Sequence, residues 1–148
     1  MPEKDKTIYL IGSLRNPELP GVANYLRGYG FDVFDDWFAG GPIADDSWQD
    51  YEKQKGTPYD VALRSHAAEH VFYFDKHHLD RSDIGVLLMP AGKSGHLELG
   101  YMKGMGKPVY VLFDKEPERW DVMYRFADGV FFDKTELAQE LQRKWGGR

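Results

Sequence analysis

Short apolar runs, separated by segments with helical spacing, constrain the fold of this chain more than any other feature. Residues 84–89 read IGVLLM, the most apolar run, and residues 7–12 read TIYLIG; a proline follows the first and a glycine ends the second. Unbroken apolar runs of this length are typical of parallel strands that are buried on both faces. Shorter runs at 31–34, 109–113 and 129–132 indicate three more strands.

Apolar residues at helical spacing lie between these runs. They predict helices at 17–30, 58–78, 96–105, 119–126 and 134–145. Strands that alternate with helices predict a parallel sheet covered on both faces through right-handed crossovers. We therefore expect one three-layer α/β domain over residues 1–148, with a five-stranded parallel sheet flanked by helices.

The composition excludes several classes of protein. Lys and Arg number 19 against 24 Asp and Glu, a net charge of −5 without basic clusters, which argues against binding a nucleic-acid polymer. The absence of cysteine excludes disulfides, thiol nucleophiles and Cys-ligated zinc. No apolar run approaches the ~20 residues of a membrane span, and the start of the chain lacks a signal-peptide core. We expect a soluble cytoplasmic protein with no membrane partner.

The segment 35–58 has no regular period and mixes aromatic, acidic and turn residues. A loop of this length inside a compact domain is usually functional or disordered, and its Trp and Tyr content disfavours disorder. The aromatic side chains either fold onto the core or hold a planar ligand by stacking, and the acids could add hydrogen bonds. The candidates for ligand binding are Asp36, Trp37, Phe38, Asp46 and Trp48.

Ligands of open α/β sheets bind at the carboxyl ends of the strands, near the point where the strand order reverses. Residues 12–16, 90–98 and 113–114 fall there. Glu98 lies near the start of a helix, behind a Gly-Lys-Ser-Gly turn, where it either complements the helix dipole or does chemistry. This turn is not a phosphate loop, because Leu87 stands where GxxxxGK[ST] requires its first glycine.

Three features together resemble the nucleoside 2-deoxyribosyltransferase family. They are IYLIGS at the first strand, Asp75 eight residues before Asp83, and SGHLELGYMKGMGKPVYVL from Ser94 onward. The resemblance extends from about Tyr9 to Leu141 and implies a flavodoxin-like or Rossmann-like domain. It also implies an enzyme that cleaves the N-glycosidic bond of deoxynucleosides and transfers the sugar to another base.

The resemblance implies a role for three residues. Glu98, in the context Gly-His-Leu-Glu-Leu-Gly-Tyr, would attack C1′ of the sugar and form a covalent ester. Asp75 would supply a proton or hydrogen bond to the leaving base, and Tyr9 would hold Glu98 in one rotamer. A carboxylate pair suffices for this chemistry, so we expect no cofactor and no metal. His66 and His70 share a helix face, but no third metal ligand is evident.

The resemblance further implies that two turns and one segment bind the substrate. These are Gly12, Ser13 and Arg15; Ser94 and Gly95; and Asp121 and Met123, which would reach a neighbouring subunit's site. The Gly-Ser-Leu-Arg turn is similar to the phosphate-binding turn of the deoxynucleoside 5′-monophosphate N-hydrolases, whereas an aspartate at 121 would repel a phosphate dianion. The second observation favours a nucleoside over a nucleotide.

The expected partners are a small (deoxy)nucleoside or nucleotide, a free nucleobase, and a second copy of the chain. A homodimer or higher homo-oligomer would place residues 119–126 in the interface. One alternative function is a (deoxy)nucleoside 5′-monophosphate N-glycosidase, a hydrolase that releases free base. A second alternative is a non-catalytic nucleotide-sensing module, because a fold does not by itself determine function.

Overall fold

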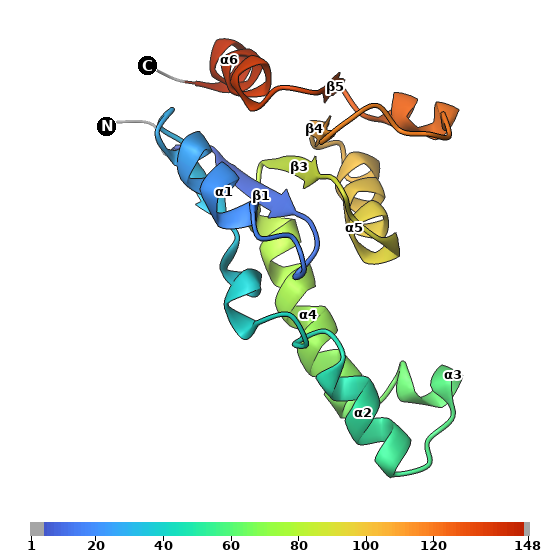
Figure 1. Cartoon of the computed structure of the whole chain (residues 1–148). Coiled ribbons are helices and arrows are strands. Elements are labelled where there is room, and N and C mark those ends of the chain that lie inside the picture. Colours follow the sequence, from blue (N-terminus) through green and yellow to red (C-terminus); the bar gives the residue numbers. More distant parts are fainter. Residues whose placement is uncertain (1–4, 147–148) are drawn as a thin grey trace.

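The computed structural model describes residues 5–146, and these residues form five parallel strands at the centre of the molecule (Figure 1). The strand order is β2-β1-β3-β4-β5, so the chain moves outward in one direction after β1 and in the other after β3. This confirms the expected α/β architecture. The strands are β1 (Thr7–Ile11), β2 (Asp32–Phe34), β3 (Ile84–Leu88), β4 (Val109–Leu112) and β5 (Gly129–Phe131).

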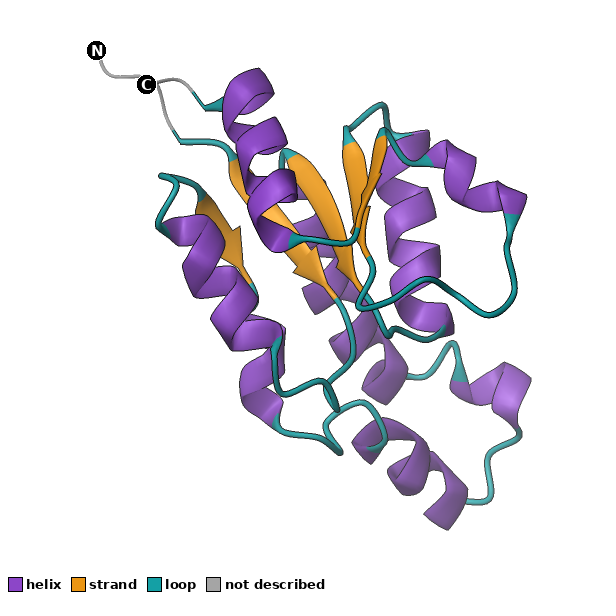
Figure 2. Ribbon diagram, turned by 45° about the horizontal axis from the view of Figure 1, so that its top comes forward, coloured by secondary structure: helices purple, strands orange, loops and turns teal. Residues whose placement is uncertain are grey.

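Helices cover both faces of the sheet, which makes three layers (Figure 2). Helices α1 (Leu19–Arg27) and α6 (Lys134–Trp145) pack on the face to which Ile8 and Leu10 point. Helices α4 (His66–Arg81) and α5 (Lys93–Gly104) pack on the opposite face, which carries Tyr9 and Ile11 of the same strand. Successive side chains of a strand point to opposite faces, so β1 supplies both cores. No helix within residues 5–146 is long and apolar enough to cross a membrane.

The expectation of one helix over 58–78 is wrong. The chain forms a short helix α3 (Tyr59–Ala62), turns, and starts α4 at His66. Ser65 causes the new start, because its Oγ accepts a hydrogen bond from the backbone N–H of Ala68 at 3.3 Å and so caps the helix.

The segment 35–58 is more regular than the sequence indicates. It contains a 3-10 helix, η1 (Asp36–Gly40), and a helix α2 (Ser47–Gln54) that packs along α4 (Figure 1). Two further boundaries differ from expectation. Helix α5 begins at Lys93 rather than residue 96, and the expected helix at 119–126 is a 3-10 helix, η2 (Val122–Phe126).

Trp37 fastens the start of this segment to the sheet. Strand β2 pairs with β1 only as far as Phe34 opposite Tyr9. Where the ladder ends, the indole N–H of Trp37 donates to the backbone carbonyl of Leu10 at 2.9 Å. Its partly buried ring also packs against both cores.

We predict that Trp37→Phe destabilises the protein, because the carbonyl of the fully buried Leu10 loses its indole donor. The expected loss is about 1–3 kcal/mol in the free energy of unfolding, measured by urea denaturation followed by circular dichroism. Trp48→Phe, in α2, is the matched control and should cost less. Equal losses in the two variants would contradict the role of the hydrogen bond.

Candidate active site

Three elements bring Glu98, Asp75 and Tyr9 together. Glu98 lies on α5, Asp75 on α4 and Tyr9 on β1, and both helices pack on the sheet face to which Tyr9 points. Tyr9 is only 2% exposed, and the two acids are partly buried. The charges of both acids act on the Tyr9 hydroxyl, which places the three groups in one site.

Burial controls the protonation of this site. It raises the pKa of Glu98 to about 7, and the negative charge of Asp75 adds to the rise, while hydrogen bonding with Tyr9 opposes it. Burial also raises the pKa of Asp75, to about 6. The pKa of Tyr9 is raised, first by burial and then by the charges of Glu98 and Asp75, so the phenol stays neutral. The acid pair therefore exchanges a proton with solvent near neutral pH.

A glycine determines how closely α5 approaches the strands. A Cβ on Gly95 would lie 3.0 Å from Leu87 Cδ1 and 3.2 Å from Ile11 Cγ2, so this first turn of the helix sits directly on the ends of β1 and β3. Residues three apart share one helix face, so Glu98 follows Gly95 on the side facing the sheet. Among the described residues, Glu98 Oε2 is buried and has no hydrogen-bond partner.

Two aromatic rings lie beside Tyr9 on the β2 side. Phe34 stacks on His78 at a ring separation of 3.9 Å and lies 5.2 Å from the ring of Tyr9. His78 follows Asp75 by three residues on α4, and burial lowers the pKa of its imidazole. The sequence does not single out either ring as a substrate contact. The position of Phe34 at the carboxyl end of β2, beside β1, is the signal that could have identified it.

The turn after β1 meets the segment 35–58. Arg15 pairs with Asp45 at 3.3 Å and with Asp46 at 3.1 Å, and its backbone N–H donates to Ser13 Oγ at 3.1 Å. Gly12 allows close packing, because a Cβ there would lie 2.7 Å from Leu19 Cδ1.

The other expected substrate residues have different surroundings. Ser94 is exposed on the first turn of α5. Asp36 is exposed just beyond the end of β2, where its charge acts on His78. Phe38 packs against the core in an edge-to-face contact with Trp37, and Trp48 is partly buried on α2.

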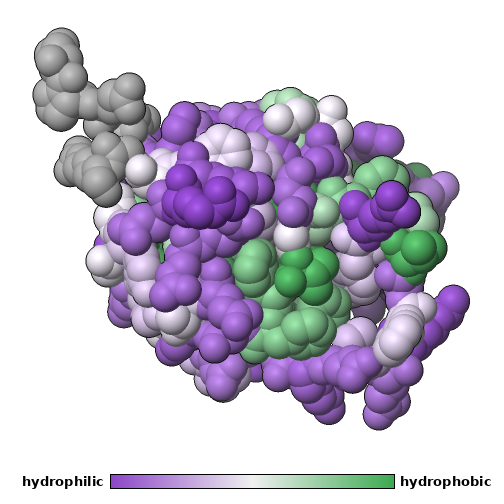
Figure 3. Space-filling view, turned by 90° about the horizontal axis from the view of Figure 1, so that it is seen from above, coloured by the Kyte–Doolittle hydropathy of each residue, from purple (hydrophilic) through white to green (hydrophobic). Residues whose placement is uncertain are grey.

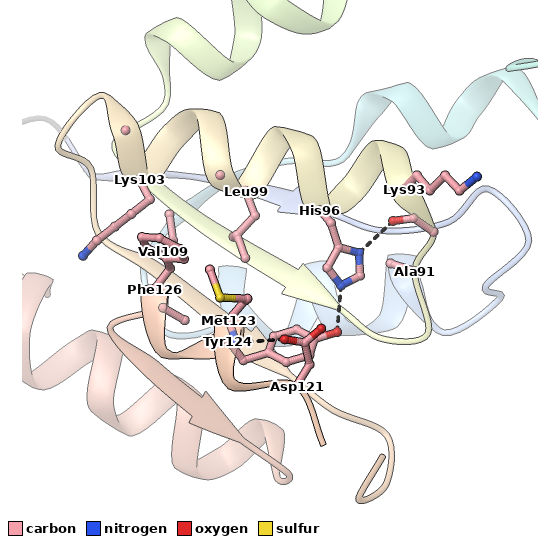
Figure 4. Close-up of a pocket in the computed structure, with 14 residues that line it drawn as sticks. Ala91, Lys93, His96, Leu99, Lys103, Val109, Asp121, Met123, Tyr124 and Phe126 are labelled. Carbon is pink, nitrogen blue, oxygen red and sulfur yellow. Dashed lines mark hydrogen bonds between the residues drawn. The ribbon is translucent and has the colours of Figure 1, made fainter. Parts of the chain in front are cut away.

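Asp121 and Met123 lie at a cavity of about 860 Å³ between α5 and η2 (Figure 4). Asp121 accepts a hydrogen bond from the backbone N–H of Met123 at 2.9 Å. His96 of α5 connects the two sides of the cavity. Its Nδ1 lies 2.8 Å from the Gly92 carbonyl, and its Nε2 lies 2.8 Å from the hydroxyl of Tyr124 in η2. The carboxyls of Glu98 and Asp75 do not line this cavity, so within one chain the structure does not join Asp121 to the acid pair.

The described part of the chain contains no cluster of side chains that could hold a metal ion. Within residues 5–146, no group of three or more His, Asp or Glu side chains converges as metal ligands would.

Comparisons with known proteins bear on the fold. No family model and no curated protein sequence matches this chain. A 2-deoxyribosyltransferase from Bacillus psychrosaccharolyticus is similar in structure, with 23% identity, 89% of this chain and 90% of that chain covered, and a TM-score of 0.59. The CMP N-glycosidase BcmB from Clostridium botulinum has 14% identity, 93% and 99% coverage, and a TM-score of 0.56.

A conserved protein from Enterococcus faecalis V583 is also similar, with 13% identity, 95% and 99% coverage, and a TM-score of 0.63. At these identities the likeness concerns the fold. It confirms the structural resemblance to the nucleoside 2-deoxyribosyltransferase family that the sequence motifs indicate. The chain thus has an α/β fold that it shares with a 2-deoxyribosyltransferase and an N-glycosidase.

We predict that Glu98→Gln stabilises the protein at neutral and higher pH. The folded pKa of about 7 exceeds the ordinary value of 4.5, so the native state binds more protons than the unfolded state between these values. Stability from this group is full below the lower pKa and is lost as pH rises through the higher one. The variant should gain on the order of 1–3 kcal/mol near pH 8 and nothing near pH 4.

Urea denaturation across this pH range measures the effect, with Glu116→Gln, an exposed glutamate, as the matched control. A difference between Glu98→Gln and the native protein that stays constant with pH would contradict the raised pKa.

Proposed function

We propose that this protein cleaves the N-glycosidic bond of 2-deoxynucleosides and transfers the sugar to another base, through a covalent ester on Glu98. The observation that carries the proposal is the buried pair of Glu98 and Asp75, with pKa values raised to about 7 and about 6 beside the neutral hydroxyl of Tyr9. A fold shared with a 2-deoxyribosyltransferase and with a CMP N-glycosidase supports it.

The acid pair retains one proton near neutral pH, and because the pKa of Glu98 is the higher, this proton must pass from Glu98 to Asp75 before the first half-reaction. The C1′–N bond breaks, its electron pair leaves with the base, and positive charge develops on the sugar. Ionised Glu98 stabilises that charge and closes a C1′–O ester, while protonated Asp75 gives its proton to the leaving base. In the second half-reaction an incoming base attacks C1′, the C1′–O ester bond breaks, and its electron pair regenerates the Glu98 carboxylate. The incoming base loses its proton to Asp75.

Tyr9 and the two oxygens of Glu98 have different roles in this scheme. Tyr9 stays protonated and hydrogen-bonds the carboxylate, which fixes the orientation of the glutamate. Oε2 has no hydrogen-bond partner among the described residues, so no hydrogen bond would be lost when this oxygen attacks C1′. The aromatic rings of Phe34 and His78 border the site and offer a wall for a planar base.

Hydrolysis of (deoxy)nucleoside 5′-monophosphates is the alternative, with water instead of a base resolving the ester. The structural likeness to a CMP N-glycosidase favours it, and the turn containing Ser13 and Arg15 could contact a phosphate. Both reactions share the step on Glu98, so the acceptor and the 5′ group distinguish them.

We predict that the protein releases adenine from deoxyadenosine, and that adding a second base yields the exchanged nucleoside, as followed by liquid chromatography. Glu98→Gln should fold normally and lose a factor on the order of 10³ or more in turnover, because no nucleophile remains. Glu116→Gln is the control. Activity retained in Glu98→Gln would remove Glu98 from its role. Binding of nucleosides with no base released from any substrate would favour the non-catalytic sensing module.

We also propose that the chain forms a homodimer through residues 119–126. Apolar side chains of this segment are unusually exposed: Trp120 by 77%, Val122 by 76%, Met123 by 58% and Phe126 by 62%. The face seen in Figure 3 gathers apolar residues into a patch bordered by hydrophilic ones. Exposed apolar clusters mark interaction surfaces, and a partner's segment could bring Asp121 to the substrate.

Val122→Asp should therefore shift the protein toward the monomer in sedimentation velocity, because a charge would be buried in the interface. Val61→Asp, an exposed valine of α3, is the matched control and should leave the distribution unchanged. A native protein that sediments as a monomer would overturn the proposed dimer.

A further inference from the structure

Arg15 has two carboxylate partners at the edge of the sheet where the candidate site lies. Its Nη1 lies 3.3 Å from Asp45 Oδ2 and its Nη2 lies 3.1 Å from Asp46 Oδ2. The turn that carries Arg15 leaves β1 after Ile11, and Gly95 of the turn before Glu98 packs on that isoleucine. The cationic turn and the turn before Glu98 are therefore neighbours.

Asp46 is held by its own segment as well as by Arg15. Gln49 Nε2 donates to Asp46 Oδ1 at 2.8 Å, so one oxygen of this carboxylate binds Gln49 and the other binds Arg15. The backbone N–H of Asp46 donates to the Ile43 carbonyl at 3.0 Å in the turn that leads into α2. Asp46 thus meets Arg15 in a defined geometry, and Asp45 adds a second contact to the same guanidinium.

This arrangement reverses the charge that the turn would present to a ligand. A guanidinium alone is a strong bidentate partner for a phosphate group. One guanidinium with two carboxylates has a formal charge of 1 − 2 = −1. A phosphate dianion would have to displace both carboxylates and would be repelled by them, whereas an uncharged hydroxyl would not.

Stability does not explain the cluster. The side chain of Arg15 is 55% exposed and those of Asp45 and Asp46 are 51% and 37% exposed. Ion pairs with this exposure are screened by water and contribute little to folding. A cluster that adds little stability but defines the charge beside the site points to a role in ligand selection.

We infer, on the basis of the function proposed above, that Asp45 and Asp46 determine substrate specificity. A sugar bound at Glu98 directs its 5′ end toward the turn 12–15. The two acids occupy the guanidinium of Arg15 and so exclude a 5′-phosphate. The substrate class is therefore nucleosides with a free 5′-hydroxyl. Removing the two negative charges frees the guanidinium for phosphate.

The test is the double variant Asp45→Asn/Asp46→Asn, assayed with deoxyadenosine and with its 5′-monophosphate. The ratio of kcat/KM for the monophosphate to that for the nucleoside should rise at least ~10-fold, as expected for a new charge-assisted hydrogen bond. Asp50→Asn/Asp60→Asn removes the same charge from exposed positions of α2 and α3 and should leave the ratio unchanged. Adding Arg15→Gln to the first variant should abolish the gain.

A binding measurement separates this inference from the proposed reaction. Calorimetry with deoxyadenosine and its monophosphate uses Glu98→Gln protein, with and without the two asparagines. If the native protein releases no base but the asparagines strengthen monophosphate binding ~10-fold, the reaction is wrong and the inference stands. A native preference for the monophosphate, no gain in the double variant, or an equal gain in the Asp50/Asp60 control overturns the inference.

Discussion

Burial of β1 and β3 on both faces is the constraint on which the rest of the structure depends. Every residue of both strands is buried, so helices must cover each face of the sheet. The neighbouring strands β2 and β4 then lie on opposite sides of this central pair, and the strand order reverses there. Ligands of such sheets bind where the order reverses, and the turns containing Gly12 and Gly95 follow these two strands.

The same burial raises the pKa values of the acid pair and lowers the stability of the folded protein at neutral pH. Glu98 and Asp75 lie where water is largely excluded, so their ionised forms are disfavoured and their pKa values rise toward neutrality. A more exposed site would leave both carboxylates ionised in solvent, and neither would hold a proton at neutral pH. Oε2 of Glu98 also lowers the folding stability, because it is buried without the hydrogen-bond partner that a buried carboxylate oxygen normally has.

The sequence predicts the parts of this structure that repeat a local pattern. Apolar runs predict all five strands, and a motif resemblance singles out Glu98, Asp75 and Tyr9, which the fold brings together. The sequence does not predict the helix break at Ser65, because the apolar spacing continues through it and one side-chain cap decides it. It also does not predict the contact of Arg15 with Asp45, because the two residues are thirty positions apart and the chain between them must fold first.

The segment 35–58 is anchored to the rest of the protein near both of its ends. Trp37 ties its start to the Leu10 carbonyl, and Glu52, only 2% exposed, anchors its end, where hydrogen bonding with Thr57 lowers the pKa of the glutamate. With both ends fixed, the middle needs only weak exposed contacts with Arg15 to hold a defined position. Such exposed contacts set the charge around Arg15 at little cost in folding free energy.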